Sequence, residues 1–330
     1  MAVEMVGIVI VTYNSEDVIG ECLDACLRVP GASVVVVDNH SLDATADIIR
    51  RRSGVRLIAN SENWGFAAGC NQGIAALETR FVLLLNPDAV LVSGLEPLIA
   101  AVSQASVAAA GGRLLNADGT TQTGFHVRGF PTAWTLCFET LGFNRLWPGN
   151  WVNRTYRPEI PDEQLSLVDQ PAGAFLMIRR AAWELVGGFD EGFQPVWFED
   201  VDFCKRLRQR GFRIVHVPAA AARHLGGHSA GKLTWPSRQL YWYGSLLRYA
   251  AKHFSASSSR IVSLAVAVSC IPRAIAGVLY HRTLTPVSVF SRVAWLAGRH
   301  FIAGPAGAPV APERGFAHSA VSSQVVEKHV

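Results

Sequence analysis

The sequence lacks the short, fixed-spacing motifs that identify several common classes of binding site. None of its 29 glycines forms a GxGxxG or GxxxxGK[ST] pattern, so neither a dinucleotide fingerprint nor a phosphate-binding P-loop is predicted. Its six cysteines include no CxxC pair and are scattered among apolar residues. This distribution favours reduced, buried thiols in a cytosolic protein over a disulfide framework.

Charged residues are also scarce. They make up only 17% of the 330 residues, and the net charge of +4 does not indicate a general nucleic-acid binder, so we expect no nucleic-acid partner. The chain enters an apolar run at once, without the basic segment and cleavage site of a signal peptide. We therefore expect a cytoplasmic protein.

Short β-branched or aliphatic runs are present at residues 6–11, 33–37 and 81–85. Continuous runs of this length are typical of parallel strands buried on both faces. Residues 15–31 have helical spacing, with Ser15 as the expected N-cap and a Pro-Gly stop. Strands and helices in this alternation predict an α/β fold with a mostly parallel sheet and right-handed crossovers.

Polar residues follow each of the three apolar runs. In parallel sheets ligands bind beyond the carboxyl ends of the strands, so these residues are candidates for one shared crevice, although turn formation alone also favours such residues. The candidates are Thr12, Tyr13, Asn14, Asp38, Asn39, Asn86 and Asp88. Asn63 and Asn71 flank a stripe of glycines that either packs closely on a strand or approaches a ligand.

Asn86 and Asp88 stand two residues apart at the end of a strand, which predicts side chains on the same side. Hard oxygen ligands of this kind, completed by phosphate oxygens and water, suit Mg²⁺ or Mn²⁺ beside a nucleotide diphosphate. An ordinary Asn-Pro-Asp turn is the alternative.

Two later regions depart from this pattern. Residues 101–170 predict a long excursion in which aromatics, Arg128, Arg154 and Arg157 line a groove for a polar, ring-shaped partner. From residue 238 the pattern is helical, but the apolar run 261–271 meets Pro272 and is too short to span a membrane, which takes about 20 residues. Helices lying against a bilayer surface, or packed on the core or on a second subunit of a homodimer, both fit.

The segment WFEDVDFC, residues 197–204, holds three carboxylates at the start of a helix predicted over about residues 200–210. Acids at a helix N-terminus stabilise it by about 0.3–1 kcal/mol each, so capping alone would account for them. Glu199 and Asp202 share a face of such a helix, whereas Asp200 points about 100° away from Glu199. We assign Asp202 to hydrogen bonds at the helix start.

The motifs taken in order resemble glycosyltransferase family 2, in particular its rhamnosyltransferase-like branch. The matching segments span roughly residues 6–250 and are IVIVTYN, VVVVDNHSLD, NWGFAAGCNQG, LLLNPDA, AGAFLMIRRAAWELVGGFDEGF, FEDVDFCKRLRQRGFRIVHVP and ARHLGGHS. The resemblance implies a GT-A fold, with a Rossmann-like nucleotide-binding domain over residues 1–237. A C-terminal amphipathic helical region over 238–305 and a disordered tail over 306–330 complete the predicted organisation.

The resemblance also implies roles for individual residues. Thr12, Tyr13 and Asn14 match the first-strand segment that contacts the nucleotide, Asp38 the acid that reads the base, and Asn63 an asparagine near the nucleoside. LNPDA takes the place of the metal-binding Asp-x-Asp, so that Asn86 replaces its first acid and Asp88 is the charged ligand. His224 matches a histidine that completes the metal site.

In the acceptor half of the site, Asp200 matches the general base of the family. We assign Glu199 to an acceptor or positioning contact, and Trp197 and Phe198 to an apolar platform for a sugar ring.

The sequence thus predicts an inverting, metal-assisted transfer of a sugar to a hydroxyl of a glycan or polyprenyl-linked cell-envelope precursor, at the cytoplasmic face of the membrane. The expected donor is dTDP-L-rhamnose, and UDP-galactose, UDP-glucose or GDP-mannose are compatible alternatives. A non-catalytic nucleotide- or carbohydrate-binding protein and a membrane-bound assembly scaffold are the rival functions.

Overall fold

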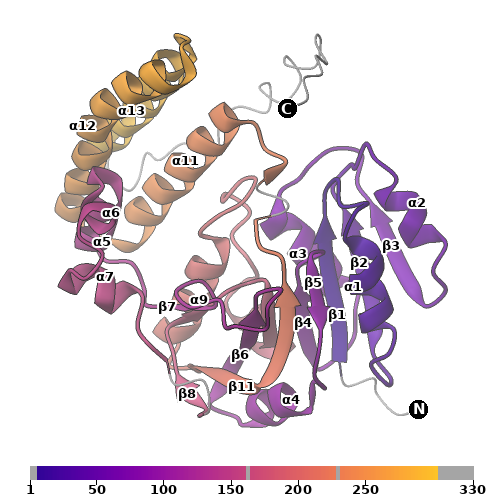
Figure 1. Ribbon diagram of the computed structural model, residues 1–330. Coiled ribbons are helices and arrows are strands. Elements are labelled where there is room, and N and C mark those ends of the chain that lie inside the picture. Colours follow the sequence, from indigo (N-terminus) through magenta and orange to yellow (C-terminus); the bar gives the residue numbers. More distant parts are fainter. Residues whose placement is uncertain (1–5, 161–163, 228–230, 304–330) are drawn as a thin grey trace.

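The computed structural model describes residues 6–160, 164–227 and 231–303 (Figure 1). The predicted tail over 306–330 lies outside the described residues. A nine-stranded sheet in the order β3-β2-β1-β4-β10-β6-β11-β5, with β8 beside β11, forms the centre of the fold, and β7 pairs with β9 separately. The strands are β1 (Val6–Thr12), β2 (Ser33–Asp38), β3 (Val55–Ala59), β4 (Phe81–Leu85), β5 (Ala89–Leu91), β6 (Val107–Leu115), β7 (Val127–Arg128), β8 (Ser166–Leu167), β9 (Gln170–Pro171), β10 (Phe175–Arg179) and β11 (Arg213–His224).

Helices cover both faces of this sheet, and a helical layer lies beside it in Figure 1. The helices are α1 (Ile19–Cys26), α2 (Thr45–Arg50), α3 (Phe66–Ala75), α4 (Glu96–Ser103), α5 (Ala133–Leu141), α6 (Phe143–Leu146), α7 (Trp151–Tyr156), α8 (Arg180–Leu185), α9 (Glu199–Gln209), α11 (Trp235–His253), α12 (Ala256–His281) and α13 (Thr285–Ala303).

The sheet is mixed but follows the predicted α/β pattern. Strand β1 is parallel to β2 and β4, whereas β10 runs antiparallel between β4 and β6. All three predicted strands are present as β1, β2 and β4, and each is buried along almost its whole length. The six cysteines are buried and unpaired, as expected from their apolar surroundings.

The helix predicted over residues 15–31 is shorter than expected. It begins at Ile19, and Val18 occupies the N-cap position, so the assignment of Ser15 as N-cap is wrong. The Ser15 carbonyl accepts hydrogen bonds from the N–H groups of Val18 and Ile19, which forms a turn before the helix.

The glycine stripe packs α3 closely against β1. A Cβ at Gly69 would lie 2.7 Å from Val11 Cγ1, and one at Gly73 would lie 2.4 Å from Val9 Cγ1. Asn71, beside this stripe, donates from Nδ2 to the Phe189 carbonyl and accepts from the Phe189 N–H. Asn71 therefore connects α3 to the segment between α8 and α9. These hydrogen bonds within the protein, and not a ligand, account for its side chain.

The excursion predicted over residues 101–170 is only partly correct. Its first part is β6, a central strand with the sequence VAAAGGRLL. Gly111 and Gly112 allow side chains of neighbouring strands to pack directly on the β6 backbone. A Cβ at Gly111 would lie 2.2 Å from Pro171 Cβ, and one at Gly112 would lie 2.1 Å from Phe175 Cε1. The excursion proper begins after β6 and includes the short helices α5, α6 and α7.

The C-terminal region is helical, as predicted, but the expected interruption at Pro272 does not occur. Helix α12 is 26 residues long and continues without a break through Pro272, which lies on its exposed side. By length and composition it could cross a membrane, with a mean hydropathy of 2.0 and one third of its most apolar window buried. One apolar cluster joins α11, α12 and α13 to α5 and to the segment before α9.

Candidate active site

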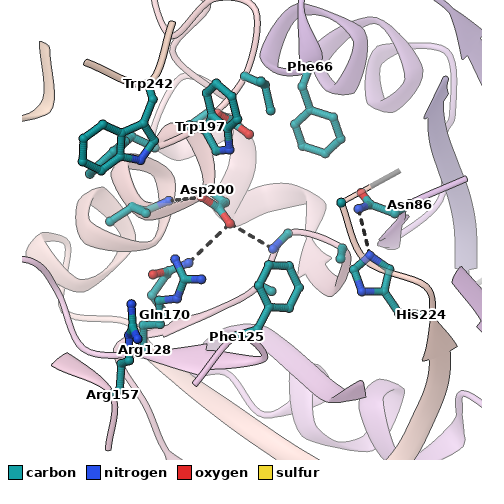
Figure 2. Close-up of a pocket in the computed structure, with 18 of the residues that line it drawn as sticks. Phe66, Asn86, Phe125, Arg128, Arg157, Gln170, Trp197, Asp200, His224 and Trp242 are labelled. Carbon is teal, nitrogen blue, oxygen red and sulfur yellow. Dashed lines mark hydrogen bonds between the residues drawn. The ribbon is translucent and has the colours of Figure 1, made fainter. Parts of the chain in front are cut away.

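A cavity of about 420 Å³ opens beyond the carboxyl end of β4 (Figure 2). It lies between the sheet and the excursion that contains α5 and α7. The residues that line it include Val11, Phe66, Asn86, Pro87, Asp88, Phe125, Arg128, Thr135, Leu136, Glu139, Tyr156, Arg157, Gln170, Ala172, Gly173, Ala174, Val196, Trp197, Phe198, Glu199, Asp200, Val201, His224, Gly227 and Trp242.

One wall of the cavity brings Asp88 and His224 together. Strand β11 pairs antiparallel with β5 so that His224 lies opposite Ala89, the residue after Asp88. Asp88 Oδ1 lies 3.4 Å from His224 Nε2, and Asp88 Oδ2 accepts from the Gly226 N–H at 3.1 Å. Asn86 Nδ2 is also 3.4 Å from His224 Nε2. The sheet thus unites residues that are more than 130 positions apart.

Asp200 lies in the cavity at the start of α9 and is held by several donors. Its Oδ2 accepts from the Gly173 N–H at 3.0 Å and from Gln170 Nε2 at 3.3 Å, while Oδ1 accepts from the Val201 N–H. A Cβ at Gly173 would lie 3.2 Å from Asp200 Cβ, so glycine permits this close approach. The carboxylate of Asp200 is therefore fixed in orientation and remains on the cavity wall.

Glu199 has a very different environment although it is the next residue. Its side chain is buried, and Oε2 has no hydrogen-bond partner among the described residues. Burial, followed by the negative charge of Asp200, raises the pKa of Glu199 well above its usual range. Glu199 is thus a buried acid that favours its neutral form, beside a carboxylate that faces the cavity.

The third acid, Asp202, faces away from the cavity. It is fully buried and accepts from Arg206 Nε at 2.8 Å, with Lys252 Nζ and His253 Nε2 both at 2.7 Å. Burial alone would raise the pKa of Asp202, but the hydrogen bond with His253 and the charge of Arg206 lower it. Asp202 therefore connects α9 to α11, a larger structural role than the predicted hydrogen bonds at the helix start.

Trp197 and Phe198 both line the cavity but differ in exposure. Both have positive φ angles, 82° and 70°, which turn the chain sharply into α9. Phe198 is buried and packs against Tyr249, whereas Trp197 is half-buried and lies near Asp200 (Figure 2). Trp197 therefore has the more accessible ring surface of the two.

The residues predicted to contact the nucleotide lie outside this cavity, at the neighbouring ends of β1 and β2. Thr12 lies opposite Asp38 in the parallel pair, and its buried Oγ1 has no hydrogen-bond partner among the described residues. Asp38 accepts from the Ser41 N–H and hydroxyl, and the Asn14 amide oxygen accepts from the Leu42 N–H. Tyr13 is half-buried beside them.

Asn63 is exposed, and its side-chain oxygen accepts from the Gly65 N–H at the start of α3. These residues adjoin the cavity along the sheet, because β2 and β1 come immediately before β4 in the strand order. Their predicted role in nucleotide binding stays a prediction.

Several cavity residues were not identified as site residues from the sequence. Gln170 and Gly173 position Asp200, Phe125 stacks on His224 at 5.4 Å between ring centroids, and Trp242 comes from α11. Gln170, Phe125 and Trp242 belong to segments without a motif, so no local pattern indicated them. Gly173 lies in the matching segment AGAFLMIRRAAWELVGGFDEGF, but no role was predicted for it. Arg128 and Arg157 were predicted only as parts of a groove, and both line the cavity.

The donor atoms at Asp88 suit a divalent cation in part. One carboxylate, one imidazole and one amide face the cavity together, while no group of three or more His, Cys, Asp or Glu that could hold a metal occurs within residues 6–160, 164–227 and 231–303. Mg²⁺ and Mn²⁺ commonly take one or two protein carboxylates and complete their shell with phosphate oxygens and water. The set therefore fits a cation that binds together with a diphosphate.

Comparisons with known proteins agree with this geometry. The family model "Glycosyl transferase family 2" matches residues 7–186. An N-acetylglucosaminyl-diphospho-decaprenol L-rhamnosyltransferase of Mycobacterium tuberculosis is 31% identical over 219 residues, which cover 61% of this chain and 68% of that protein. Rhamnosyltransferase WbbL of Escherichia coli is 27% identical over 263 residues, covering 75% of this chain and 93% of WbbL.

Among solved structures, GalNAc-T7 with UDP, GalNAc and Mn²⁺ superposes with a TM-score of 0.52 at 16% identity, covering 76% of this chain and 50% of that one, a likeness of fold. The mixed sheet flanked by helices is that of the GT-A glycosyltransferases. From the match over residues 7–186 and the related rhamnosyltransferases, the chain belongs to glycosyl transferase family 2 and is a glycosyltransferase.

Proposed function

We propose that this glycosyltransferase inverts the anomeric centre of a nucleotide-activated sugar and transfers the sugar to a hydroxyl group, with Asp200 as general base. The observation that carries the proposal is the Asp200 carboxylate, held by Gly173 and Gln170 at the wall of a cavity that also contains Asp88 and His224. A base must be within hydrogen-bond reach of the proton that it removes, and an acceptor hydroxyl in this cavity meets that condition.

The leaving diphosphate would lie on the Asp88 side of the cavity. Asp88 and His224, with Asn86 beside them, would hold Mg²⁺ or Mn²⁺, which supplies positive charge opposite the phosphate oxygens. The nucleoside would extend toward Thr12, Tyr13, Asn14, Asp38 and Asn63 at the ends of β1 and β2. The unpartnered hydroxyl of Thr12 supports a polar ligand there.

The acceptor half of the cavity suits a sugar. Glu199 Oε2 and Gln170 Oε1 are buried, line the cavity and have no hydrogen-bond partner among the described residues. Buried polar atoms are normally satisfied, and the hydroxyl groups of a sugar would supply partners. Trp197, with Phe198 behind it, offers an aromatic surface for the ring.

We propose dTDP-L-rhamnose as the donor and a polyprenyl-linked cell-envelope precursor as the acceptor. Two relatives carry rhamnosyltransferase names, and the name of one includes a diphospho-decaprenol. UDP-hexoses and GDP-mannose are the alternative donors. The loops that would select the sugar carry no motif that distinguishes between these donors.

An apolar face of α12 supports peripheral contact with the cytoplasmic side of a membrane. Ile261, Leu264, Val268, Ile271, Ile275 and Leu279 form one helical stripe and are 52–75% exposed. Three exposed tryptophans lie nearby in the chain: Trp134 in α5, Trp147 directly after α6 and Trp151 at the start of α7. Arg273 of α12 donates to the Thr140 carbonyl of α5. Aliphatic, Trp and Arg side chains together are typical of helices at a bilayer interface.

A panel of nucleotide sugars tests the function directly. Each donor is added to the protein with and without Mn²⁺, and both the thermal shift and the release of nucleoside diphosphate are measured. A ligand that binds only the native state raises Tm, so the correct donor gives the largest shift and is turned over in the presence of an acceptor. Binding of a donor without turnover by any acceptor tested would favour the non-catalytic alternative.

A further inference from the structure

Two arginines line the cavity on the side away from Asp88. Arg128 lies on β7 and Arg157 follows α7, and both contact Gly124. Arg128 Nε donates to the Gly124 carbonyl at 3.0 Å, and a Cβ at Gly124 would lie 3.5 Å from Arg157 Cδ. Figure 2 shows the two side chains on the opposite side of Asp200 from Asn86 and His224.

The charge of this arginine pair is only partly balanced by the protein. Arg128 forms no ion pair among the described residues, and its guanidinium lies over the rings of Phe125 and Tyr156, at 5.5 and 6.0 Å from their centroids. Arg157 lies 3.9 Å from one Glu139 oxygen. Within the described part of the chain Arg128 therefore has no carboxylate paired with it, and Arg157 has one at the limit of ion-pair distance. Phosphate oxygens match such guanidinium groups in both charge and geometry.

Whether the arginine pair would bind a phosphate of the donor or of the acceptor depends on where it lies relative to Asp200. Arg128 lies opposite Gln170 in the β7–β9 pair, and Gln170 Nε2 is 3.3 Å from Asp200 Oδ2. Strand β9 leads into β10, which lies on the other side of β4 from β1 and β2. The ring of Phe125 stands between His224, on which it stacks, and Arg128. The arginine pair is therefore on the acceptor side.

From this arrangement we infer that the acceptor is itself a phosphorylated sugar, and that Arg128 and Arg157 bind its phosphate or diphosphate while a hydroxyl of the same sugar reaches Asp200. This inference rests on the proposed function, since it assigns a substrate class to the same cavity. Gln170 lies opposite Arg128 in the β7–β9 pair and also donates to Asp200, so the base and the arginine adjoin the same residue on the cavity wall.

The test uses two acceptors that carry the same sugar. One is N-acetylglucosamine joined through a diphosphate to a farnesyl chain, and the other is the neutral octyl N-acetylglucosaminide. Binding of each probe to the full-length protein is measured by calorimetry for wild type, Arg128→Gln and Arg157→Gln. Arg154→Gln is the matched control, because Arg154 is an exposed arginine on α7 that does not line the cavity.

We expect Arg128→Gln to weaken binding of the diphosphate probe at least 10-fold relative to any change with the neutral probe, and Arg157→Gln to have a smaller effect because Glu139 already faces it. Arg154→Gln should bind as wild type does. Arg128→Lys, which keeps the charge but loses the planar fork, should give an intermediate value and guards against misfolding as the cause.

Equal losses with both probes, or no loss with the diphosphate probe, would overturn the inference. So would a larger loss in affinity for dTDP than for the diphosphate probe, because the pair would then serve the donor. Release of nucleoside diphosphate by the wild type is measured separately. Its absence with every donor would overturn the proposed function, whereas the calorimetry still tests the arginine pair.

Discussion

At the scale of single residues, the acidic segment WFEDVDFC contains three different environments. Asp200 is oriented on the cavity wall, Glu199 is buried without a partner for Oε2, and Asp202 connects two helices. Helical geometry in the sequence was enough to predict that Asp200 points away from the face that Glu199 and Asp202 share. It could not predict that Lys252 and His253, about 50 residues later, would surround Asp202.

Glu199→Gln tests the state of the buried acid. Because the pKa of Glu199 is raised in the folded protein, the native state binds more protons than the unfolded state above the unfolded pKa, and stability is lost as pH rises toward the folded pKa. Glutamine does not ionise, so the variant does not lose this stability as pH rises. It should therefore have a higher Tm than wild type, and the difference in Tm should grow from pH 5 to pH 8. Thermal unfolding at several pH values measures it. A difference independent of pH would show that Glu199 does not titrate abnormally.

At the scale of helices and strands, the sequence predicted best where apolar runs are continuous and β-branched. Strands β1, β2 and β4 were found in this way, whereas β6 was missed because alanine and glycine carry a weak strand signal. Its small residues are needed because Pro171 and Phe175 pack directly on it. The uninterrupted α12 was missed because Pro normally breaks a helix, a cost that depends on the tertiary setting.

Asp190, in the segment before α9, should stabilise the attachment of α11 in a pH-dependent way. Burial would raise its pKa, but hydrogen bonds from Lys252, the Gly192 N–H and Arg248 lower it to about 2. A depressed folded pKa gives stability that is present above the unfolded pKa, near 3.8, and is lost as pH falls through 2. Asp190→Asn should therefore cost about 1–2 kcal/mol at pH 7 and less at pH 3.

Urea unfolding at the two pH values measures this cost. Asp47→Asn is the matched control, since Asp47 pairs with Arg50 on the exposed surface and should change stability by less than about 0.5 kcal/mol. An equal cost for Asp190→Asn at pH 7 and pH 3 would contradict the assigned ion pairs.

The exposed stripe of α12 should determine membrane binding. Replacing Ile271 and Leu279 by serine removes two large apolar side chains that are 67% and 75% exposed. Binding to vesicles of phosphatidylglycerol and phosphatidylethanolamine, measured by flotation, should fall at least 10-fold because these side chains no longer enter the bilayer interface. Leu185→Ser, on α8, is the control with a similarly exposed leucine. Unchanged flotation of the double variant would exclude this face as the contact.

At the scale of the whole molecule, the excursion α5–α7 joins the cavity to the C-terminal helices. Thr135, Leu136, Glu139, Tyr156 and Arg157 line the cavity, and Arg273 ties α12 to the end of α5 (Figure 1). An acceptor with a lipid tail could therefore present its sugar to Asp200 while the tail follows the apolar surface. The family resemblance predicted the donor side from ordered motifs. On the acceptor side it predicted only Trp197, Phe198, Glu199 and Asp200, whereas Gln170, Phe125 and Trp242 lie in segments without motifs and were placed at the cavity by the fold.

The most direct test of the account compares turnover by wild type and Asp200→Asn with the donor and acceptor identified from the panel. Loss of the general base should lower kcat by about 100- to 10,000-fold, while the donor still raises Tm as it does for wild type. Glu184→Gln, an exposed carboxylate on α8 outside the cavity, should keep wild-type turnover. Equal rates for wild type and Asp200→Asn would remove Asp200 from the mechanism and contradict the central claim.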